Sequence, residues 1–492
     1  MKQNKFLAID FGAESGRAIV GILENNKIQL EEVHRFPNRP VNIHGSIHWN
    51  IQNLFEELKT GIVKAIQKGH SDIKSIAVDT WGVDFGFVTK DNQLLGSPFA
   101  YRDSRTNGIL EKAFKLLPKS EIYNLTGIQF MQINSAFQLL SMVKSKSEIL
   151  KFADKLLFMP DLFNFLLTGI KKSEYTISST SQLLNAKSKN WENKIFNGLK
   201  IPKKIMCEIV PPGTKIGKLH SSICNSTGLK NVEVIAVGSH DTASAVAAVP
   251  NLKNNWAFIS SGTWSLIGIE TEKPIINNKS FEYNFTNEGG VGGKIRFLRN
   301  VMGMWIIQQI KKEWELEGKI YSYTQINKMA EKAAPFRCFI DVDSQEFLNP
   351  QSMISAINNY CKDTNQNIPK TKAEYIRSVL ESLAFKYRVI IESINSISKN
   401  TIEVINIVGG GSQNELLNQF TADCTGLKVV AGPVEATAFG NILVQAIANN
   451  VIKDISSGRK IISKSVELKE FIPTNIKRWE NSFQKVKNIL NN

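Results

Sequence analysis

Asp241 is the residue whose surroundings most favour acid–base chemistry. It lies in GSHDTASA (238–245), directly after a run that predicts a strand and at the start of a run that predicts a helix. Open α/β sheets bind ligands at such positions, and the positive end of a helix favours an ionised carboxylate. An ionised aspartate that faces a substrate hydroxyl can act as the general base in phosphoryl transfer. Aspartate is also a common helix N-cap, so the residues alone leave both roles open.

Two hairpins with small residues at their tips could hold phosphate groups. FLAIDFGAESGRAIVGIL (6–23) and WAFISSGTWSLIGIE (256–270) each read as two apolar strands joined by a tight turn. Such turns bring backbone N–H groups close together, and Ser15, Thr263 and Ser265 would add hydroxyl donors. Asp10, at the end of the first strand, could hold Mg²⁺ through water. Each hairpin taken singly is also compatible with a purely structural role.

The familiar nucleotide-binding motifs are not fulfilled. In EGGVGGKI (288–295), Glu288 replaces the first glycine of a P-loop, and Ile295 stands where Ser or Thr should follow the lysine. GGGSQN (409–414) lacks the last glycine of the dinucleotide fingerprint. If the chain binds ATP, it must do so with another geometry.

The stretches DTWGVDFGFV (79–88) and YRDSRTNG (101–108) combine an aromatic ring with polar groups. Trp81 could stack on the C–H face of a sugar while neighbouring polar groups bind its hydroxyls. Trp81 could equally be a core residue, which composition alone favours. Arg102 and Asp103 could likewise form a surface ion pair.

The elements that must position these groups predict an α/β protein with two domains. Apolar runs indicate strands at 6–11, 17–23, 75–88 and 232–239, and helical patterns follow at 136–150 and 242–249. Pro250 ends the last of these helices, so we expect the domains to be residues 1–248 and 249–492. VINIVGGGSQNELLNQFTADCTG (404–426) reads as a strand, a glycine turn and a helix. A terminal helix should follow Pro473 and could pack back on the first domain.

Composition excludes several classes of protein. The 492 residues are 42% hydrophobic and 21% charged, a globular composition, with no apolar run long enough for a bilayer and no cleavage-site pattern, so we expect a cytoplasmic protein. The net charge of +15 comes from lysines spread along the chain, and without a nucleic-acid-binding motif we expect no nucleic-acid partner. Five cysteines without a C-x-x-C pair predict neither a zinc site nor a disulfide framework. His44 and His48 are expected in a loop or strand edge rather than on a metal.

Taken together, the motifs resemble the FGGY family of carbohydrate kinases, which has the larger actin-like ATPase fold. They run in order from residue 6 to about residue 441, cover most of the chain, and are AIDFGAESGRAIV, SIAVDTWGVDF, AYRDSRTNG, YNLTGIQFMQINSAFQLL, LLFMPDLFNFLLTG, EYTISSTSQLLN, SHDTASAV, SSGTWSLIG, TNEGG, RNVMGMWIIQ and VGGGSQNELLNQFTADCTGLKVVAGPVEATAFGN. The glycine turns are generic. DTWGVDF, YRDSRT and SHDTASAV in this order are similar to the branch that acts on L-rhamnulose rather than on glycerol or xylulose.

The resemblance implies two actin-like (ribonuclease H-like) α/β domains with an interdomain cleft, and a reaction in which ATP, with Mg²⁺, phosphorylates the C1 hydroxyl of L-rhamnulose. By motif, Asp241 would be the catalytic base. The sugar would contact Trp81, Gly82, His240, Asp241, Thr242 and Asn300. The nucleotide would contact Ala13, Glu14, Ser15, Gly16, Arg17, Thr263, Gln308 and Gly410, with Asp10 holding the metal through water.

Glu14 departs from the resemblance, since many relatives carry a small residue in this turn. A carboxylate beside phosphate groups is unfavourable, so we expect Glu14 to point outward. The alternatives are another ketose kinase of the family, such as one acting on L-fuculose, and a non-catalytic sugar sensor. The oligomeric state stays open at this point.

Overall fold

The protein is described by a computed structural model that covers residues 3–251, 255–399 and 401–490. The chain forms two compact units that are discontinuous in sequence. Unit 1 comprises Met1–Leu252, Glu270–Phe297 and Ala436–Val466, and unit 2 comprises Lys253–Ile269, Leu298–Glu435 and Glu467–Asn492. The predicted division at 248/249 treats each domain as one continuous segment, whereas the chain crosses repeatedly between these units.

Unit 1 is built on a six-stranded sheet of order β13-β14-β6-β1-β2-β3. β1 (Asn4–Phe11) and β2 (Ser15–Glu24) form the predicted antiparallel hairpin, and β1 pairs in parallel with β6 (Ser75–Thr80). β14 (Glu233–Ile235) continues the parallel pairing, and β13 (Lys215–Lys218) and β3 (Lys27–Pro37) form the edges. β6 is buried along its whole length, as expected of a central strand covered on both faces.

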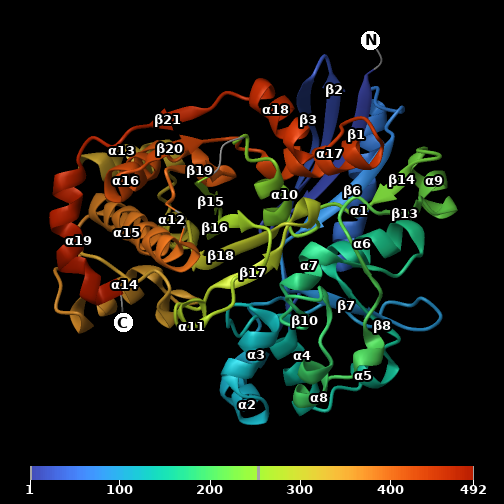
Figure 1. The fold of residues 1–492 in the computed structure, drawn as a ribbon, viewed down its shortest axis with the longest axis horizontal. Coiled ribbons are helices and arrows are strands. Elements are labelled where there is room, and N and C mark those ends of the chain that lie inside the picture. Colours follow the sequence, from blue (N-terminus) through green and yellow to red (C-terminus); the bar gives the residue numbers. More distant parts are fainter. Residues whose placement is uncertain (1–2, 252–254, 400, 491–492) are drawn as a thin grey trace. The chain divides into compact units, whose positions relative to one another are not determined.

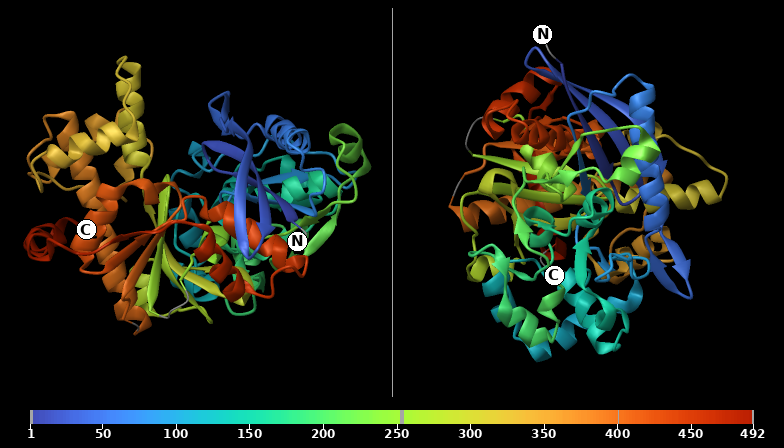
Figure 2. Two further views of the ribbon diagram at one scale, coloured as in Figure 1. Left: turned by 90° about the horizontal axis from the view of Figure 1, so that it is seen from above. Right: turned by 90° about the vertical axis from the view of Figure 1, so that its right-hand side faces the viewer.

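Helices cover both faces of this sheet. On one face, Phe11 stacks on Phe163 of α6 (Met159–Thr168), and Gly61 of α1 (Ile51–Gln67) packs closely on Ala18. On the other face lies α17 (Ala436–Ala448), whose Ile442 packs on Gly21 and which also packs on α10 (Asp241–Ala247). Figures 1 and 2 show α17 and α18 (Ile455–Ser465), late in the sequence, beside the first strands of the chain.

The rest of unit 1 consists of short elements, many of them between β6 and α10. Its strands are β4 (Val41–Ile43), β5 (Ser46–His48), β7 (Phe85–Val88), β8 (Lys155–Phe158), β9 (Ser173–Glu174), β10 (Leu184–Asn185), β11 (Asn190–Trp191), β12 (Ile209–Val210) and β17 (Thr286–Gly289). Its helices are α2 (Ile109–Leu116), α3 (Lys119–Thr126), α4 (Ser135–Lys144), α5 (Ile149–Phe152), α7 (Tyr175–Ser179), α8 (Asn193–Leu199), α9 (Ser221–Thr227) and α11 (Asn278–Glu282).

Two predicted elements of unit 1 are each divided in two. The strand expected over 75–88 ends at Thr80 and resumes at Phe85, because Val83 has a left-handed φ of 68° and turns the chain. The helix expected over 136–150 ends at Lys144, and Lys146 with φ 54° separates it from α5. Apolar periodicity did not reveal these turns, although Gly82, next to Val83, was a turn signal at the first of them; the segment around Lys146 contains neither glycine nor proline.

The second sheet of the chain has seven strands in the order β17-β18-β16-β15-β19-β20-β21. β17 and the residues of β18 up to Phe297 are counted with unit 1, and β18 from Leu298 onward with unit 2. β15 (Trp256–Ser261) and β16 (Trp264–Thr271) form the second predicted hairpin, and β15 pairs in parallel with β19 (Val404–Val408). The other strands and the helices are β18 (Ile295–Met302), β20 (Lys428–Ala431), β21 (Lys469–Phe471), α12 (Trp305–Leu316), α13 (Tyr323–Lys332), α14 (Met353–Asp363), α15 (Lys372–Ser398), α16 (Glu415–Thr425) and α19 (Ile476–Leu490).

The terminal helix α19 lies in unit 2. Trp479 packs on Phe385 of α15 and on Phe420 of α16, and Phe483 stacks on Phe385. This apolar face covers α15 and α16 beside it in Figure 1, so these ring contacts lie within unit 2.

Other sequence predictions concern cysteine, histidine and membrane segments. All five cysteines are free. His48 lies in β5 and His44 in the turn before it, as the loop or strand-edge interpretation expects. Across the described residues, no helix combines the length and the apolar character that a membrane span requires.

Candidate active site

Asp241 is the first residue of α10, and His240, not Asp241, is the N-cap residue. Its Oδ1 accepts hydrogen bonds from the backbone N–H (2.5 Å) and the hydroxyl (3.2 Å) of Thr242. The Asp241 side chain remains 30% exposed, so a ligand can reach it. Burial raises the pKa of Asp241, and the neighbouring His240 opposes that rise. The carboxylate is therefore held in place without being fully saturated by protein donors.

Two further carboxylates lie at the ends of the central strands of unit 1. Asp10 and Asp79 are register partners on β1 and β6, and Asp10 forms an ion pair with Arg17 across the hairpin (Oδ2–Nη2 2.5 Å). Asp79 is fully buried, and its Oδ2 accepts a hydrogen bond from Asn441 Nδ2 of α17 (2.6 Å). Burial raises the pKa of Asp79 well above its usual range, and the nearby charge of Asp10 adds to this.

The backbone joins the end of β6 to the Asp241 segment. The N–H of Thr80 donates to the carbonyl of Ser239 (2.9 Å), and Thr80 and His240 form an isolated parallel bridge. Gly82 lies next to His240, since a Cβ at this position would be 3.3 Å from His240 Nε2. The structure thus brings together predicted sugar contacts that are widely separated in sequence, namely Gly82, His240, Asp241 and Thr242.

Trp81 is a buried residue whose indole has a defined partner. It is 5% exposed, its Nε1–H donates to Asp84 Oδ2 (3.0 Å), and it packs on Trp49 with ring centroids 4.2 Å apart. This environment agrees with the core interpretation of Trp81 and leaves little ring surface for a sugar.

Asp84 is the hub of this buried polar cluster, and its role was not foreseen. It accepts hydrogen bonds from Trp49 Nε1 (2.6 Å), the Tyr101 N–H (3.1 Å) and Gln138 Nε2 (2.9 Å), besides Trp81. Burial raises the pKa of Asp84 to about 6.

The YRDSRT stretch does not form the surface arrangement that was considered for it. Asp103 is buried and accepts the backbone N–H groups of Ile47 (2.8 Å) and Arg105 (3.0 Å). Arg105 also donates to Gln138 Oε1 (2.5 Å), so this stretch supports the Asp84 cluster.

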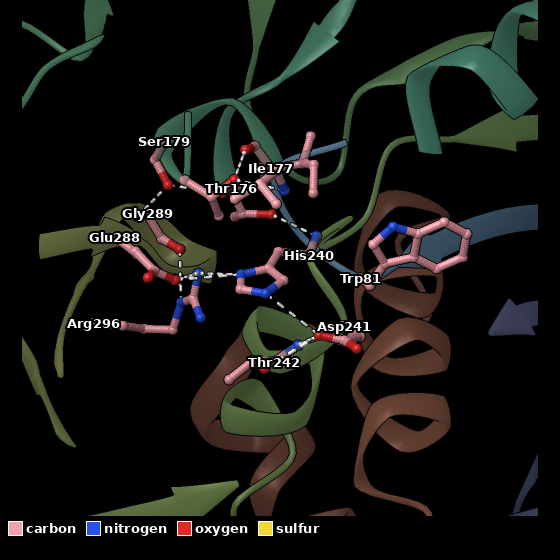
Figure 3. Close-up of polar contacts among 12 residues, drawn as sticks. Trp81, Thr176, Ile177, Ser179, His240, Asp241, Thr242, Glu288, Gly289 and Arg296 are labelled. Atoms are coloured by element: carbon pink, nitrogen blue, oxygen red, sulfur yellow. Dashed lines mark hydrogen bonds and ion pairs between the residues drawn. The ribbon is translucent and has the colours of Figure 1, made fainter. Parts of the chain in front are cut away.

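His240 is the centre of a second buried cluster, shown in Figure 3. Its Nε2 is 3.4 Å from Asp241 Oδ1, and its Nδ1 is 3.3 Å from Glu288 Oε2 of β17 and 3.1 Å from Arg296 Nη2 of β18. Arg296 is fully buried; it donates to the carbonyl of Gly289 (2.8 Å) and pairs with Glu288 (3.2 Å).

Sequence reasoning assigned no role to Glu288 or Arg296. Glu288 entered only as a mismatch to the P-loop pattern and as part of the motif TNEGG. The available signal was Arg296 itself, the single charge inside the apolar run IRFL, because an arginine is rarely fully buried unless it is paired.

The predicted phosphate turn of unit 1, Ala13–Arg17, includes the start of β2. Gly12 N–H donates to the Ser15 carbonyl (2.9 Å), and Asn38 clamps the turn through Gly12 O (2.8 Å) and Glu14 O (2.9 Å). Gly16 admits no side chain, since a Cβ there would lie 2.3 Å from the Phe36 ring. Glu14 is exposed, in line with the expected outward orientation.

Unit 2 contains the other predicted nucleotide contacts, Thr263, Gln308 and Gly410. The carbonyl of Thr263, at the tip of the second hairpin, accepts the N–H groups of Gly303 (3.1 Å) and Trp305 (3.2 Å), which leads directly into α12 and Gln308. Gln308 Oε1 is buried and has no hydrogen-bond partner in the part of the chain that the structure describes.

The glycine turn after β19 packs on the same hairpin. A Cβ on Gly411 would be 2.0 Å from Ser261 Oγ, whereas a Cβ on Gly410 would meet nothing within 4 Å. Gly410 is exposed and so is accessible to a ligand. Asn300, the remaining predicted sugar contact, is a partly exposed residue of β18 in unit 2.

The carboxylates of unit 1 suit a metal that keeps most of its hydration. Within residues 3–251, 255–399 and 401–490, no cluster of three or more His, Cys, Asp or Glu is arranged as a metal site. Asp79 Oδ1 is buried without a hydrogen-bond partner among the same residues, next to Asp10 in register. One or two oxygen ligands with water and substrate phosphates fit Mg²⁺, which dehydrates reluctantly.

Comparison with known proteins shows full-length similarity to sugar kinases. The chain is 43% identical over 490 residues to a rhamnulokinase from Bacteroides thetaiotaomicron, covering 100% of both chains. It is 42% identical over 462 residues to a rhamnulokinase from Oceanobacillus iheyensis, covering 94% of this chain and 97% of the relative.

Solved structures show the same fold at low sequence identity. The ligand-bound xylulose kinase from Lactobacillus acidophilus aligns with a TM-score of 0.81 at 16% identity, covering 99% of this chain and 98% of that one. A glycerol kinase from Plasmodium falciparum with ADP aligns with a TM-score of 0.79, also at 16% identity and with the same coverage. The expected α/β fold with two actin-like domains is therefore confirmed.

Family models match most of the chain. The N-terminal domain of the FGGY family of carbohydrate kinases matches residues 5–248, and the C-terminal domain of that family matches residues 257–449. Together with the full-length relatives, these matches show that the chain belongs to the FGGY family of carbohydrate kinases.

Proposed function

We propose that the protein transfers the γ-phosphoryl group of ATP to the C1 hydroxyl of L-rhamnulose, giving L-rhamnulose 1-phosphate and ADP, in L-rhamnose catabolism. The observation that carries the substrate assignment is the 43% identity, over the whole of both chains, to a rhamnulokinase. The reaction type is supported by the accessible Asp241 carboxylate at the strand-to-helix junction of unit 1.

In the proposed reaction, Asp241 acts as the general base. Its carboxylate takes the proton of the C1 hydroxyl as that oxygen forms a bond to the γ-phosphorus, and the bond from phosphorus to the β–γ bridging oxygen breaks with its electron pair leaving on ADP. A base held within hydrogen-bond reach of the hydroxyl makes the oxygen a better nucleophile at the moment of transfer. Thr242 fixes the carboxylate through two hydrogen bonds, so little reorganisation is needed.

The other predicted contacts divide between the two substrates. Gly82, His240, Thr242 and Asn300 are proposed to bind the sugar, and Trp81 to support that pocket from its buried position. The Ala13–Arg17 turn, Thr263, Gln308 and Gly410 are proposed to bind ATP. Asp10 would hold Mg²⁺ through water, and the ion would offset the negative charge of the phosphates. We place the reaction in the cytoplasm and propose no nucleic-acid or membrane partner.

The test is ADP release from the purified protein with MgATP and a panel of L-rhamnulose, L-fuculose, D-xylulose, L-ribulose and glycerol, with a blank that contains no sugar. We expect the highest kcat/KM with L-rhamnulose. Preference for L-fuculose or another sugar would retain the kinase and replace the substrate. Absence of turnover with every sugar would support a sensor instead.

A further inference from the structure

The cluster around His240 contains two buried charged residues that do not reach Asp241 directly. Arg296 Nη2 is 3.1 Å from His240 Nδ1, and the opposite ring nitrogen, Nε2, is 3.4 Å from Asp241 Oδ1. Glu288 contacts both His240 and Arg296. Figure 3 shows the order Glu288 and Arg296, then the imidazole, then Asp241.

Hydrogen-bond chemistry limits the protonation states that this order allows. A guanidinium can only donate, so an imidazole nitrogen that faces Arg296 Nη2 must accept. A neutral imidazole that accepts at Nδ1 carries its proton on Nε2, the nitrogen that faces the carboxylate of Asp241. A doubly protonated imidazole would place an N–H against the guanidinium and is disfavoured.

We infer that Arg296 and Glu288 are positioning residues for the catalytic base, which hold His240 as the neutral imidazole with its proton on Nε2, facing Asp241. Glu288 neutralises the buried charge of Arg296 and orients it, and the Gly289 carbonyl anchors its Nε. A neutral N–H donor orients Asp241, whereas an imidazolium would form an ion pair with it and lower its basicity. The inference rests on the proposed role of Asp241 in phosphoryl transfer.

Other titratable groups also surround this cluster. Asp10, at the end of β1, adds negative charge near Asp241, and the buried carboxyl of Asp79 lies beside Asp10 in register. Glu174, before α7, accepts a hydrogen bond from the hydroxyl of Thr176 (2.6 Å), and that hydroxyl oxygen accepts one from the backbone N–H of His240 (3.2 Å). Tyr175 lies near Arg296. Within this set the carboxylates supply negative charge, and Arg296 supplies the positive charge next to His240.

Replacing Arg296 tests this balance. In Arg296→Met, His240 lies between the carboxylates of Glu288 and Asp241 and should be protonated near neutral pH. We expect kcat to fall about tenfold or more at pH 6.5 and to recover to within about threefold at pH 9, so that the acid limb of the kcat/KM profile moves upward. The KM for the sugar should change little, because the substrate contacts remain.

Two variants separate positioning from folding. Arg296→Lys keeps the positive charge and should return the acid limb toward that of the wild type, although one ammonium cannot reproduce all three contacts. Arg377→Met breaks a comparable buried pair, Arg377–Glu381 of unit 2 (2.7 Å), and should lower stability without moving the acid limb. An acid limb that stays in place in a folded Arg296→Met protein would overturn the inference.

A measurement on the wild type requires neither folding of a variant nor sugar turnover. In ¹⁵N-histidine-labelled protein, the nitrogen shifts distinguish the two neutral tautomers and the cation, and His240→Gln assigns the signal among the six histidines. We expect His240 to be neutral with its proton on Nε2 at pH 7. A proton on Nδ1, or a cation, would overturn the inference while leaving the proposed reaction intact. Absence of sugar turnover with the expected tautomer would instead overturn the proposed reaction and, with it, the positioning role, leaving only the tautomer assignment.

Discussion

The two units share one sheet arrangement and carry different chemistry at the same place in it. In unit 1, β1 is antiparallel to β2 and parallel to β6, and in unit 2, β15 is antiparallel to β16 and parallel to β19. The strand ends of unit 1 present the carboxylates Asp10 and Asp79. Those of unit 2 present Ser260 and Ser261, followed across the sheet by the Gly409–Gly411 turn.

The difference indicates a division of labour on one framework. Carboxylates can take a proton and hold a hydrated cation, whereas hydroxyls, backbone N–H groups and glycines allow anionic phosphates to approach closely. The common strand order also supports the two hairpins being related, for which their short sequence match was insufficient.

The largest expected effect follows from removing the proposed base of unit 1. Asp241→Asn should lower kcat by about 10³-fold, because an amide cannot take the proton, while the Thr242 hydrogen bonds can persist. ADP release and a thermal unfolding curve measure the two quantities. Asp91→Asn, an exposed residue of the same unit, should leave kcat unchanged. Wild-type turnover in Asp241→Asn would show that Asp241 is not the base, and the proposed chemical difference between the units would lose its main support.

Asp84 should show that a buried carboxylate of unit 1 can be structural rather than reactive. Its folded pKa of about 6 exceeds the ordinary value of 3.8, so between these values the native state binds more protons than the unfolded state. Stability therefore decreases as pH rises through this window, by about 2 kcal/mol between pH 4 and 7 for this group. Asp84→Asn has no carboxylate to ionise at this position, so this pH-dependent loss of stability should be absent from the variant.

Denaturant unfolding of both proteins at pH 4 and pH 7 measures the effect. As the pH rises from 4 to 7, the wild type should lose unfolding free energy relative to Asp84→Asn. Asp91, whose pKa is lowered by Thr89, should give a small change of opposite sign on substitution by Asn. If the difference in unfolding free energy between the wild type and Asp84→Asn did not change with pH, the pKa of Asp84 would not be raised by burial as inferred.

In unit 2, the glycine turn after β19 should depend on close packing rather than on charge. Gly411→Ala would place a methyl group 2.0 Å from Ser261 Oγ and 2.5 Å from Ser261 Cβ, which should cost about 2 kcal/mol and lower the melting temperature. Gly410→Ala is the matched control, since its methyl group has open space and should be nearly neutral for stability. Equal melting temperatures of the two variants would contradict the packing argument.

The smallest effect is expected for a neutral hydroxyl in the proposed nucleotide site. Thr263→Ala should raise the KM for ATP about fivefold, near the value of one uncharged hydrogen bond, with kcat and the KM for the sugar almost unchanged. Steady-state kinetics with each substrate varied in turn provides the measurement. A loss comparable to that of Asp241→Asn would show that unit 2 also contributes directly to the chemical step.

Sequence patterns determined the features that depend on local periodicity and local chemistry. Both hairpins, the α/β class and the strand-to-helix junction at Asp241 follow from residues adjacent in the chain, as does the absence of a P-loop. The turn at Lys146 was missed because it contains no glycine or proline. The turn at Val83 was missed although Gly82 precedes it, because Val83 itself carries no signal for a left-handed φ.

The supporting contacts of the candidate site were decided by the tertiary structure alone. Arg296 meets His240 from 56 residues away, and Asn441 meets Asp79 from 362 residues away. Such pairs form only after sheets and helices have packed, and a single sequence contains no period or spacing that joins them. The sequence therefore determined which residue could act as the base, and the packing decided which buried charges surround it.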